Sequence, residues 1–199
     1  MQSANVLGRG HYQLALEPSA FGLYGPSNPS TFPALNVRAQ LGINERVDLG
    51  IRVGGTGIEI LSKYQITDPA SPGLILSVAP SAGSFVVLSP EVQGGIVYAQ
   101  LPMLLGVPVG RHQLILGPKA QEWLMIGSSR GVGGFVNELN VGGTVGFLLA
   151  VTDHFKLLPE VGLLYPLLES LSYSGVSGTS VAGKNGVFTQ VGLGVIFGN

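Results

Sequence analysis

The chain of 199 residues contains no cysteine, which excludes disulfides and thiolate metal sites. Charged residues are scarce as well, at 11% of the chain against roughly 25% in ordinary soluble domains. The ten basic and eleven acidic residues nearly cancel, which argues against a protein that grips nucleic acid with a basic face. The low charge, together with 31 glycines, also excludes an acidic disordered chain and a coiled coil.

Long apolar helical runs are missing too. The longest promising uncharged stretch, residues 92–110, contains Pro102, Pro108 and four glycines, so it is poor material for a transmembrane helix. The first residues, MQSANVLGRGHY, lack the basic and apolar regions of a secretory signal, and we interpret Met1 as an initiator added to a mature, processed chain. The apolar surface must therefore be carried by something other than helices.

Strict alternation of apolar and polar residues recurs along the chain. Residues 35–43 place leucine, valine, alanine and isoleucine on one face and Asn36, Arg38 and Gln40 on the other. A period of two predicts strands, and no helical stripe competes with it. We expect ten such strands, at about 11–24, 34–44, 47–54, 57–66, 73–83, 95–106, 112–121, 138–151, 155–165 and 187–197.

The connections between these strands alternate in length. Those at one end are short: 44–46, 67–72, 107–111 and 152–154. Those at the other end are mostly long: 25–33, 84–94, 122–137 and 167–186, with only Gly55-Thr56 brief. This pattern is typical of outer-membrane barrels. The sequence therefore predicts an all-β fold, with residues 1–199 forming a single antiparallel transmembrane β-barrel of about ten strands in an up-and-down meander.

Charge placement favours the same fold, because no charge falls on the apolar face of a predicted strand. A lipid-facing charge at the midplane costs about 2–4 kcal/mol, whereas the outer face of a soluble sandwich meets water and usually carries more charge. We expect a network of paired charges in the lumen, formed by Glu17, Arg38, Asp48, Arg52, Glu59, Lys63, Lys119, Lys156 and Glu160, with Glu138 as a further inward charge.

Aromatic residues bracket the apolar faces. Tyr12 and Tyr24 mark the two ends of the first strand, and strands of this length tilted by about 45° span roughly 23–28 Å. We expect aromatics at the lipid interface at Tyr12, Tyr24, Tyr64, Tyr98, Trp123, Phe155, Tyr165 and Phe197. The alternatives are the core of a soluble β-protein and, for Trp123, an exposed contact in the 122–137 loop.

The last strand, VFTQVGLGVIF, alternates Val191, Leu193 and Val195 up to Phe197. In this it resembles the C-terminal assembly signal of small bacterial outer-membrane β-barrel proteins, although in that family the aromatic is usually the last residue. The resemblance is one of pattern and covers nearly the whole chain. It implies a Gram-negative outer membrane as the location, the lipid bilayer as a partner, and periplasmic N- and C-termini.

Two features oppose this barrel. Five prolines fall inside predicted strands, where each removes a ladder donor, so bulges or ladder gaps are needed at Pro18, Pro80, Pro102, Pro118 and Pro159. The strand at 95–106 is apolar on both faces, so either something apolar fills the lumen beside it or it packs on a protein partner.

The function expected from these patterns is a structural or binding scaffold with a mostly occluded, charge-paired lumen and a possible protein partner at its extracellular loops. The alternatives are a narrow porin-like pore for small solutes and a soluble β-barrel that binds an apolar ligand. An enzyme is not expected, because His11, His112 and His154 map to the short-turn end, away from the long loops where omptin-like protease sites open. A three-histidine metal cluster there is the weaker hypothesis, and no cofactor, metal or nucleic-acid partner is expected.

Overall fold

The computed structural model describes residues 2–24, 30–55, 57–70, 73–88, 92–129, 132–173, 176–181 and 186–198. Among the described residues, no helix is long and apolar enough to cross a membrane. The strands are β1 (Tyr12–Tyr24), β2 (Ser30–Gly42), β3 (Val47–Gly54), β4 (Gly57–Gln65), β5 (Ile75–Val78), β6 (Ser81–Leu88), β7 (Val92–Val109), β8 (His112–Ser129), β9 (Val132–Ala150), β10 (Phe155–Tyr173), β11 (Val176–Val181) and β12 (Val187–Gly198).

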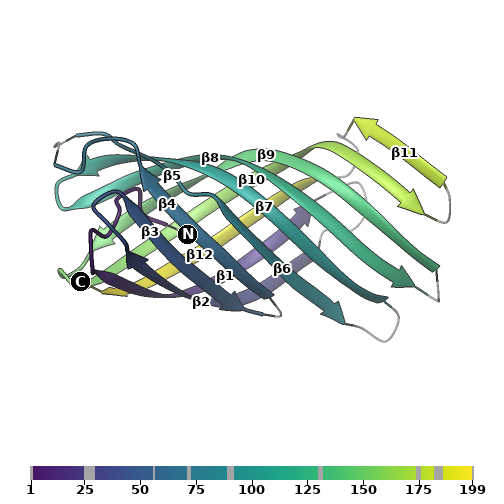
Figure 1. The fold of residues 1–199 in the computed structure, drawn as a ribbon, viewed down its shortest axis with the longest axis horizontal. Coiled ribbons are helices and arrows are strands. Elements are labelled where there is room, and N and C mark those ends of the chain that lie inside the picture. Colours follow the sequence, from purple (N-terminus) through teal and green to yellow (C-terminus); the bar gives the residue numbers. More distant parts are fainter. Residues whose placement is uncertain are drawn as a thin grey trace.

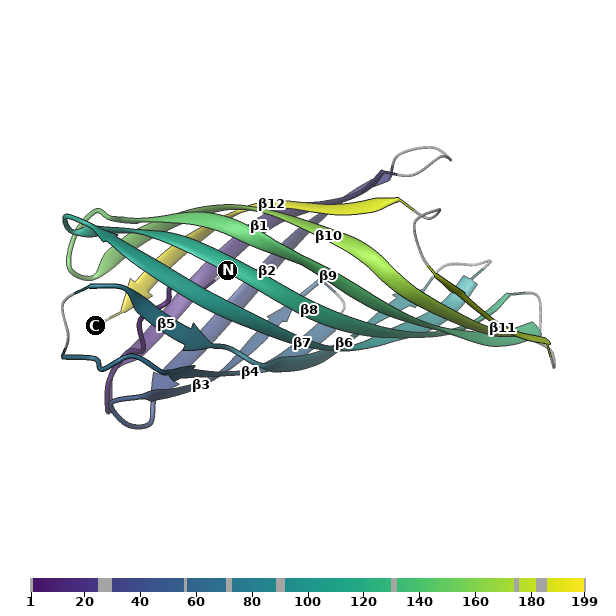
Figure 2. The same cartoon turned by 90° about the horizontal axis from the view of Figure 1, so that it is seen from above.

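These strands form a closed antiparallel barrel (Figures 1 and 2). Most strands pair with their neighbours in the chain, and β12 closes the ring by pairing with both β1 and β10. β5 and β6 share one place between β4 and β7, while β11 folds back on the end of β10. The barrel therefore has ten strands in a meander, as the sequence predicts.

The two ends of the barrel differ. We call the end at the left of Figure 1 the base: it holds the C-terminus and the turns at 43–46, 110–111 and 151–154. We call the opposite end, where β11 lies, the mouth. The chain enters β1 from the base, and Gln2, Ser3 and Ala4, which precede β1, are buried, whereas Arg9 to His11 are exposed.

Apolar side chains cover the outside of the barrel, and polar ones fill the inside. Val145, Val161 and Val191 are cross-strand neighbours on β9, β10 and β12, and each is more than half exposed. By contrast, the inward side chains of Arg38 and Lys63 are almost completely buried. This distribution is the reverse of that in a water-soluble protein and suits a barrel surrounded by lipid.

The predicted long loops are strands over most of their length, so that part of the prediction is wrong. β7 to β10 contain 18 or 19 residues each, and together with β6 they cover most of 84–94, 122–137 and 167–173. At about 3.3 Å per residue and 45° tilt they reach roughly 40 Å along the barrel axis, well beyond an apolar band of roughly 25 Å. Beyond that band the outer face no longer has to be apolar, so the alternation fades although the backbone pairing continues.

The prolines coincide with gaps in the ladder, as the sequence analysis requires. Pro80 separates β5 from β6, so the predicted single strand at 73–83 is interrupted. Pro102 and Pro118 share one gap between β7 and β8, and the β1–β12 and β9–β10 ladders are each interrupted beside Pro18 and Pro159. Neighbouring backbone groups still find partners: the Ala79 amide donates to the Pro102 carbonyl at 3.0 Å.

Substitution of Val161 by lysine tests which face meets lipid. The side chain lies near the middle of β10 on the outer face, so Val161→Lys is expected to lower the free energy of unfolding in lipid vesicles by about 2–4 kcal/mol. The same change at Val151, an exposed residue at the base, is expected to cost no more than about 1 kcal/mol. Equal effects at the two positions would contradict a lipid-facing exterior.

Candidate functional site

Residues Gln2 to Leu7, here called the N-terminal segment, run through the lumen near the base. The segment is not part of the sheet, so its amide groups need side-chain acceptors from the barrel wall. The Leu7 amide donates to Asp48 Oδ1 at 2.9 Å, and the Ala4 amide donates to Gln113 Oε1 at 3.2 Å. The acceptors come from opposite parts of the sequence, on β3 and β8, so the segment is held from several sides.

The carbonyl groups of the same segment accept hydrogen bonds from the wall. Lys63 Nζ donates to the carbonyls of Ser3 and Asn5, and the Ser77 hydroxyl donates to the carbonyl of Ala4. Lys63 is also ion-paired with Asp48 at 3.0 Å. One lysine on β4 therefore ties the segment to the charge network of the lumen.

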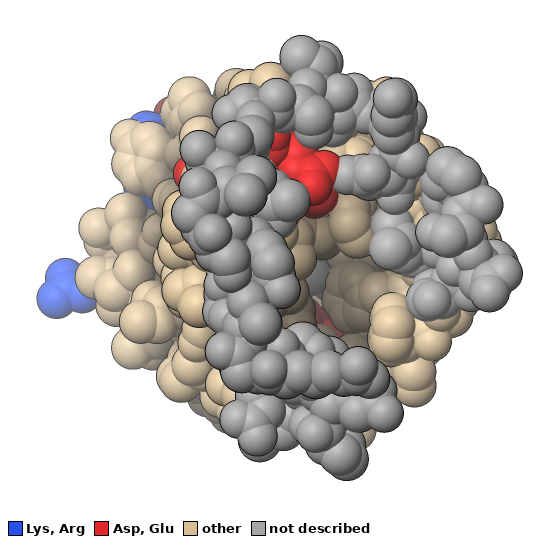
Figure 3. Space-filling view, turned by 90° about the vertical axis from the view of Figure 1, so that its right-hand side faces the viewer, with Lys and Arg blue, Asp and Glu red and all other residues tan. Residues whose placement is uncertain are grey.

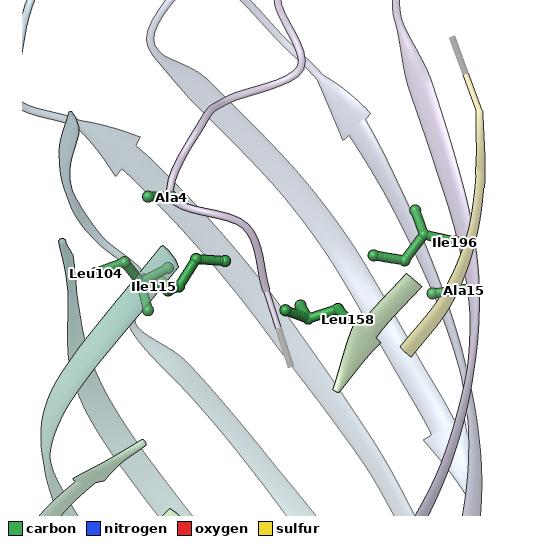
Figure 4. Packing of buried hydrophobic residues seen from close by; sticks show 7 residues of the cluster. Ala4, Ala15, Leu104, Ile115, Leu158 and Ile196 are labelled. Carbon is green, nitrogen blue, oxygen red and sulfur yellow. The ribbon is translucent and has the colours of Figure 1, made fainter. Parts of the chain in front are cut away.

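An apolar cluster surrounds Ala4 inside the barrel (Figure 4). Five of its members come from strands, whereas Ala4 and Ala79 do not, and all are almost completely buried: Ala4, Ala15, Ala79, Leu104, Ile115, Leu158 and Ile196. Leu104 belongs to the strand that is apolar on both faces, so part of its inner face is covered by the chain itself. The residue that covers it is Ala4, which lies before the first predicted strand at 11–24.

Two glycines make room for this packing. A Cβ atom on Gly106 would lie 2.7 Å from Cβ of Ala4, and one on Gly42 would lie 1.8 Å from the Gly8 carbonyl oxygen. Gly8 itself has a φ of +82°, which glycine adopts readily, and it lies where the chain turns from β1 into the lumen. Larger residues at Gly42 or Gly106 would push the N-terminal segment out of place.

A chain of ion pairs crosses the inner wall above the segment. Glu17 accepts from Arg38 Nε at 2.7 Å and from Arg52 Nε at 2.8 Å. Arg52 also pairs with Glu59, which accepts further hydrogen bonds from Ser81, Gln100 and Tyr98. The chain thus links β1, β2, β3, β4, β6 and β7. Buried charges of this kind are tolerated only when each is paired.

The remaining inward charges are less tightly paired. Lys119 on β8 lies within electrostatic range of Glu160 on β10. Among the described residues, however, Lys119, Lys156 and Glu160 form no ion pair of 4 Å or less. The structure therefore brings Glu17, Arg38, Arg52 and Glu59 together, and Asp48 with Lys63, but does not extend the network to these three residues.

Most of the expected interface aromatics lie on the outer face. Tyr12, Tyr24, Tyr64, Tyr165 and Phe197 are exposed. The ring of Phe155 stacks beside that of Phe197 with centroids 5.2 Å apart. Their contact with the membrane interface stays a prediction.

Tyr98 and Trp123 lie on the inner face, so the prediction that they sit at the lipid interface is wrong. Tyr98 hydrogen-bonds Glu59, and its ring end is 2.7 Å from where a Cβ on Gly83 would be. The Trp123 ring meets Phe188 edge-on at 4.6 Å. Residues 95–106 are apolar on both faces, so the sequence pattern does not show which way Tyr98 points. Residues 122–137 were expected to form a loop, so no strand alternation was used to decide which face Trp123 occupies.

The mouth half of the lumen is hollow and contains acidic side chains (Figure 3). Glu138 on β9 lies opposite Trp123 on β8 and opposite Glu169 on β10. A bulge between Pro166 and Leu168 shifts the register of β10 and turns Glu169 to the same face as Glu138. Sequence reasoning missed Glu169, because it expected a loop there and a bulge leaves no signal in the alternation.

The three histidines lie in separate environments. His112 Nδ1 accepts a hydrogen bond from the Ala150 amide at 3.2 Å, and its ring lies 5.9 Å from that of Phe147. His154 Nδ1 lies 3.3 Å from the Gly198 carbonyl oxygen. Within the described part of the chain, no group of three histidine or acidic side chains is placed to hold a metal ion.

Comparison with known proteins identifies the fold. No protein-family model and no curated protein matches the sequence. Among solved structures, the translocator domain of the autotransporter NalP from Neisseria meningitidis is similar, with a TM-score of 0.52 and 13% identity over 96% of this chain and 88% of that one. A major outer membrane protein from Thermus thermophilus has a TM-score of 0.43 and 13% identity over 94% and 99% of the two chains.

A third similar structure is Ail, the attachment invasion locus protein of Yersinia pestis, with a TM-score of 0.42 and 12% identity over 95% of this chain and 99% of that chain. At 13% identity, the likeness to the NalP translocator domain concerns the fold alone. The chain has the fold of bacterial outer-membrane β-barrel proteins.

The Glu17 carboxylate is shared by the buried Arg38 and the partly buried Arg52. Glu17→Gln leaves Arg38 without its carboxylate partner and Arg52 with Glu59 alone, so we expect the free energy of unfolding to fall by about 3–5 kcal/mol in urea titrations of the refolded barrel. Glu45→Gln, at an exposed position of a base turn, removes the same charge and is expected to change stability by at most about 0.5 kcal/mol. A Glu17→Gln variant as stable as Glu45→Gln would show that the pairs contribute little.

Proposed function

We propose that the protein is an integral outer-membrane barrel that serves as a binding scaffold, with a lumen closed at the base and accessible from the mouth. The base faces the periplasm in this proposal, and the C-terminus and the entry of the N-terminal segment lie on that side. The protein does not conduct solutes in its resting form.

The membrane location is supported by the outer surface. The exposed outer side chains along the middle of the barrel are valine, leucine and isoleucine, and tyrosines flank them on β1 and β10. The first charged outward residue of the long strands is Glu122, which hydrogen-bonds Asn137 on the outer face of β9 at 3.1 Å. This polar pair fits the level at which long strands leave the apolar band and enter water.

The orientation is supported by the contrast between the ends. Outer-membrane barrels have short periplasmic turns and extend further on the extracellular side. The base has short turns at 110–111 and 151–154, whereas β7 to β10 project furthest at the mouth (Figure 2).

The closed lumen is supported chiefly by one observation, the N-terminal segment hydrogen-bonded inside the barrel. Its residues Gln2, Ser3 and Ala4 are buried, and it contacts side chains from β3, β4, β5 and β8. The Glu17–Arg38–Arg52–Glu59 chain occupies the next level. A barrel of about ten strands is barely wider than one that side chains fill, so these two layers suffice to block it.

A narrow pore is the second candidate, because a cavity remains at the base. It has a volume of about 320 Å³ and lies beside the N-terminal segment, lined by Asn5, Leu7, Gln65, Gly73 and Pro108 among others. Solutes could cross the barrel through this cavity only if it continued past the apolar cluster around Ala4.

Conductance across planar bilayers separates the two candidates. The purified protein is expected to insert without discrete current steps, while a general porin measured in parallel gives steps under the same conditions. Stable unitary openings of the unmodified protein would overturn the occluded scaffold and favour the pore.

Removal of the N-terminal segment tests what closes the base. Deletion of Gln2 to Leu7 removes the backbone that fills the space between Lys63, Ser77 and Gln113, so we expect discrete openings to appear in the same bilayers. Ala4→Gly keeps this backbone and is expected to stay closed. A folded deletion variant without openings would show that the ion-pair chain alone blocks the lumen.

A further inference from the structure

We infer that the mouth half of the lumen is a binding site for a small, uncharged apolar molecule, formed by a belt of inward aromatic side chains. The belt consists of Phe21, Phe32, Phe85, Tyr98, Trp123 and Phe188. The inference rests on the proposed function and deepens it, because a scaffold closed at the base and open at the mouth takes its ligand from the mouth, and the belt indicates the chemistry of that ligand.

The strand register turns two phenylalanines toward the lumen. Phe21 lies four residues after the inward Glu17 on β1, and side chains an even number of positions apart on a strand share a face. Phe32 on β2 lies directly opposite Phe21 and six residues before the inward Arg38. The β1–β2 ladder runs through these positions without a shift of register, so both rings lie on the inner face.

The other four members continue the belt around the lumen. Tyr98 and Trp123 are direct cross-strand partners on the inner faces of β7 and β8. The Trp123 ring meets that of Phe188 edge-on with centroids 4.6 Å apart, although β9 and β10 lie between their strands. On β6, Phe85 is two residues from Gly83, which lies opposite Tyr98 and therefore faces inward. The belt thus runs from β6 through β7, β8 and β12 to β1 and β2.

The belt is accessible rather than packed. Phe32 is 62% exposed and Phe21 is 40% exposed, and the other four rings are partly exposed. Side chains that merely filled the lumen would be as buried as the apolar cluster around Ala4. The lumen is hollow at this end (Figure 3). The aromatic surface is therefore available to a ligand.

An aromatic inner surface is unusual in a barrel of this kind, because the lumen of an outer-membrane barrel is ordinarily polar. Apolar surface left in water costs free energy, and a concave site lined by aromatic side chains is typical of small-molecule pockets. A molecule that covers the exposed parts of Phe21 and Phe32 removes this cost. A barrel of about ten strands is barely wider than one that side chains fill, so the belt admits a small molecule and not a folded partner.

Polar groups beneath the belt are already engaged with one another. Tyr98 hydrogen-bonds Glu59, which is also paired with Arg52. Gln100 Nε2 donates to Glu59 Oε1 at 2.8 Å and to the Ser81 hydroxyl at 2.9 Å. A sugar or an ionic ligand loses water when it enters and needs polar partners in return, whereas an apolar ligand does not. The geometry therefore favours an uncharged aromatic or alkyl compound.

Trp123 is the only tryptophan of the chain and belongs to the belt, so energy transfer from it reports a fluorophore bound there. The refolded full-length barrel, kept soluble by an amphipathic polymer, is titrated with N-phenyl-1-naphthylamine, which is uncharged. The charged probe is 8-anilino-1-naphthalenesulfonate, which has the same ring skeleton, and polymer without protein gives the background. We expect saturable, tryptophan-sensitised emission from the uncharged probe and binding of the sulfonate that is weaker by roughly tenfold or more.

Two phenylalanines of opposite faces form a matched pair of variants. Phe32 faces inward and is 62% exposed, whereas Phe135 is 44% exposed and lies two residues from Asn137 on the outer face of β9. Phe32→Ser is expected to weaken binding of the uncharged probe roughly fivefold or more, because the apolar contact with one ring is lost, and Phe135→Ser is expected to change it by less than about twofold. Phe32→Leu keeps an apolar side chain and is expected to restore most of the affinity. Heat-modifiable migration on a gel confirms that each variant is folded.

The proposal is overturned by an unmodified protein without a saturable response, by equal weakening in Phe32→Ser and Phe135→Ser, or by a folded Phe32→Leu variant that binds no better than Phe32→Ser. Tighter binding of the sulfonate, or displacement of the uncharged probe by maltose, overturns it as well.

The measurement is independent of bilayer current. A barrel that conducts but binds the uncharged probe overturns the occluded lumen alone, and a silent barrel that does not bind it overturns the apolar site alone.

Discussion

Hydrogen bonding of the backbone is the constraint on which this structure depends. In hydrocarbon no water is present to satisfy a free amide or carbonyl, so a sheet that crosses a membrane must close on itself. The pairing of β12 with β1 and with β10 provides this closure. Once the ring is closed, the period of two sends alternate side chains to lipid and to the lumen, and every charged side chain in the membrane-crossing part must turn inward.

The inward charges create a second requirement, because the lumen is too narrow to hydrate them fully. Glu17 is compensated because it accepts hydrogen bonds from two arginines. Lys63 is compensated because it pairs with Asp48 and donates to the N-terminal segment. The segment is therefore more than a filler. It supplies carbonyl groups that Lys63 and Ser77 need, while the wall supplies carboxylate and amide oxygens that its own N–H groups need.

Much of this fold is predictable from the sequence. The alternation in residues 35–43, the absence of outward charge and the paired tyrosines of β1 are enough for ten strands, their faces and the closed meander. The ladder gaps at Pro18, Pro102 and Pro159 are predictable too, because proline has no amide hydrogen to donate. These features share a cause. Each of them restricts one residue independently of its contacts with other residues, so the restriction is visible in a single sequence.

The parts that were not predicted depend on contacts between distant residues. Nothing in the uncharged stretch Gln2 to Gly8 marks it as a lumen segment, because its backbone is held by side chains from four strands. Trp123 and Glu169 lie beyond the apolar band, where the alternation fades and a bulge can reverse a face unnoticed. The same loss of pattern made strands of 18 and 19 residues look like loops.

Because the chain contains no cysteine, a single introduced thiol can report whether the N-terminal segment closes the lumen. Ala4→Cys places a thiol at a position that is 0% exposed inside the lumen, and Arg9→Cys places one at an exposed position beside the entry of the N-terminal segment. With a water-soluble maleimide on the folded barrel, we expect rapid labelling at position 9 and protection at position 4 until the barrel is unfolded. Equal labelling rates at the two positions in the folded protein would contradict a lumen closed by its own N-terminal segment.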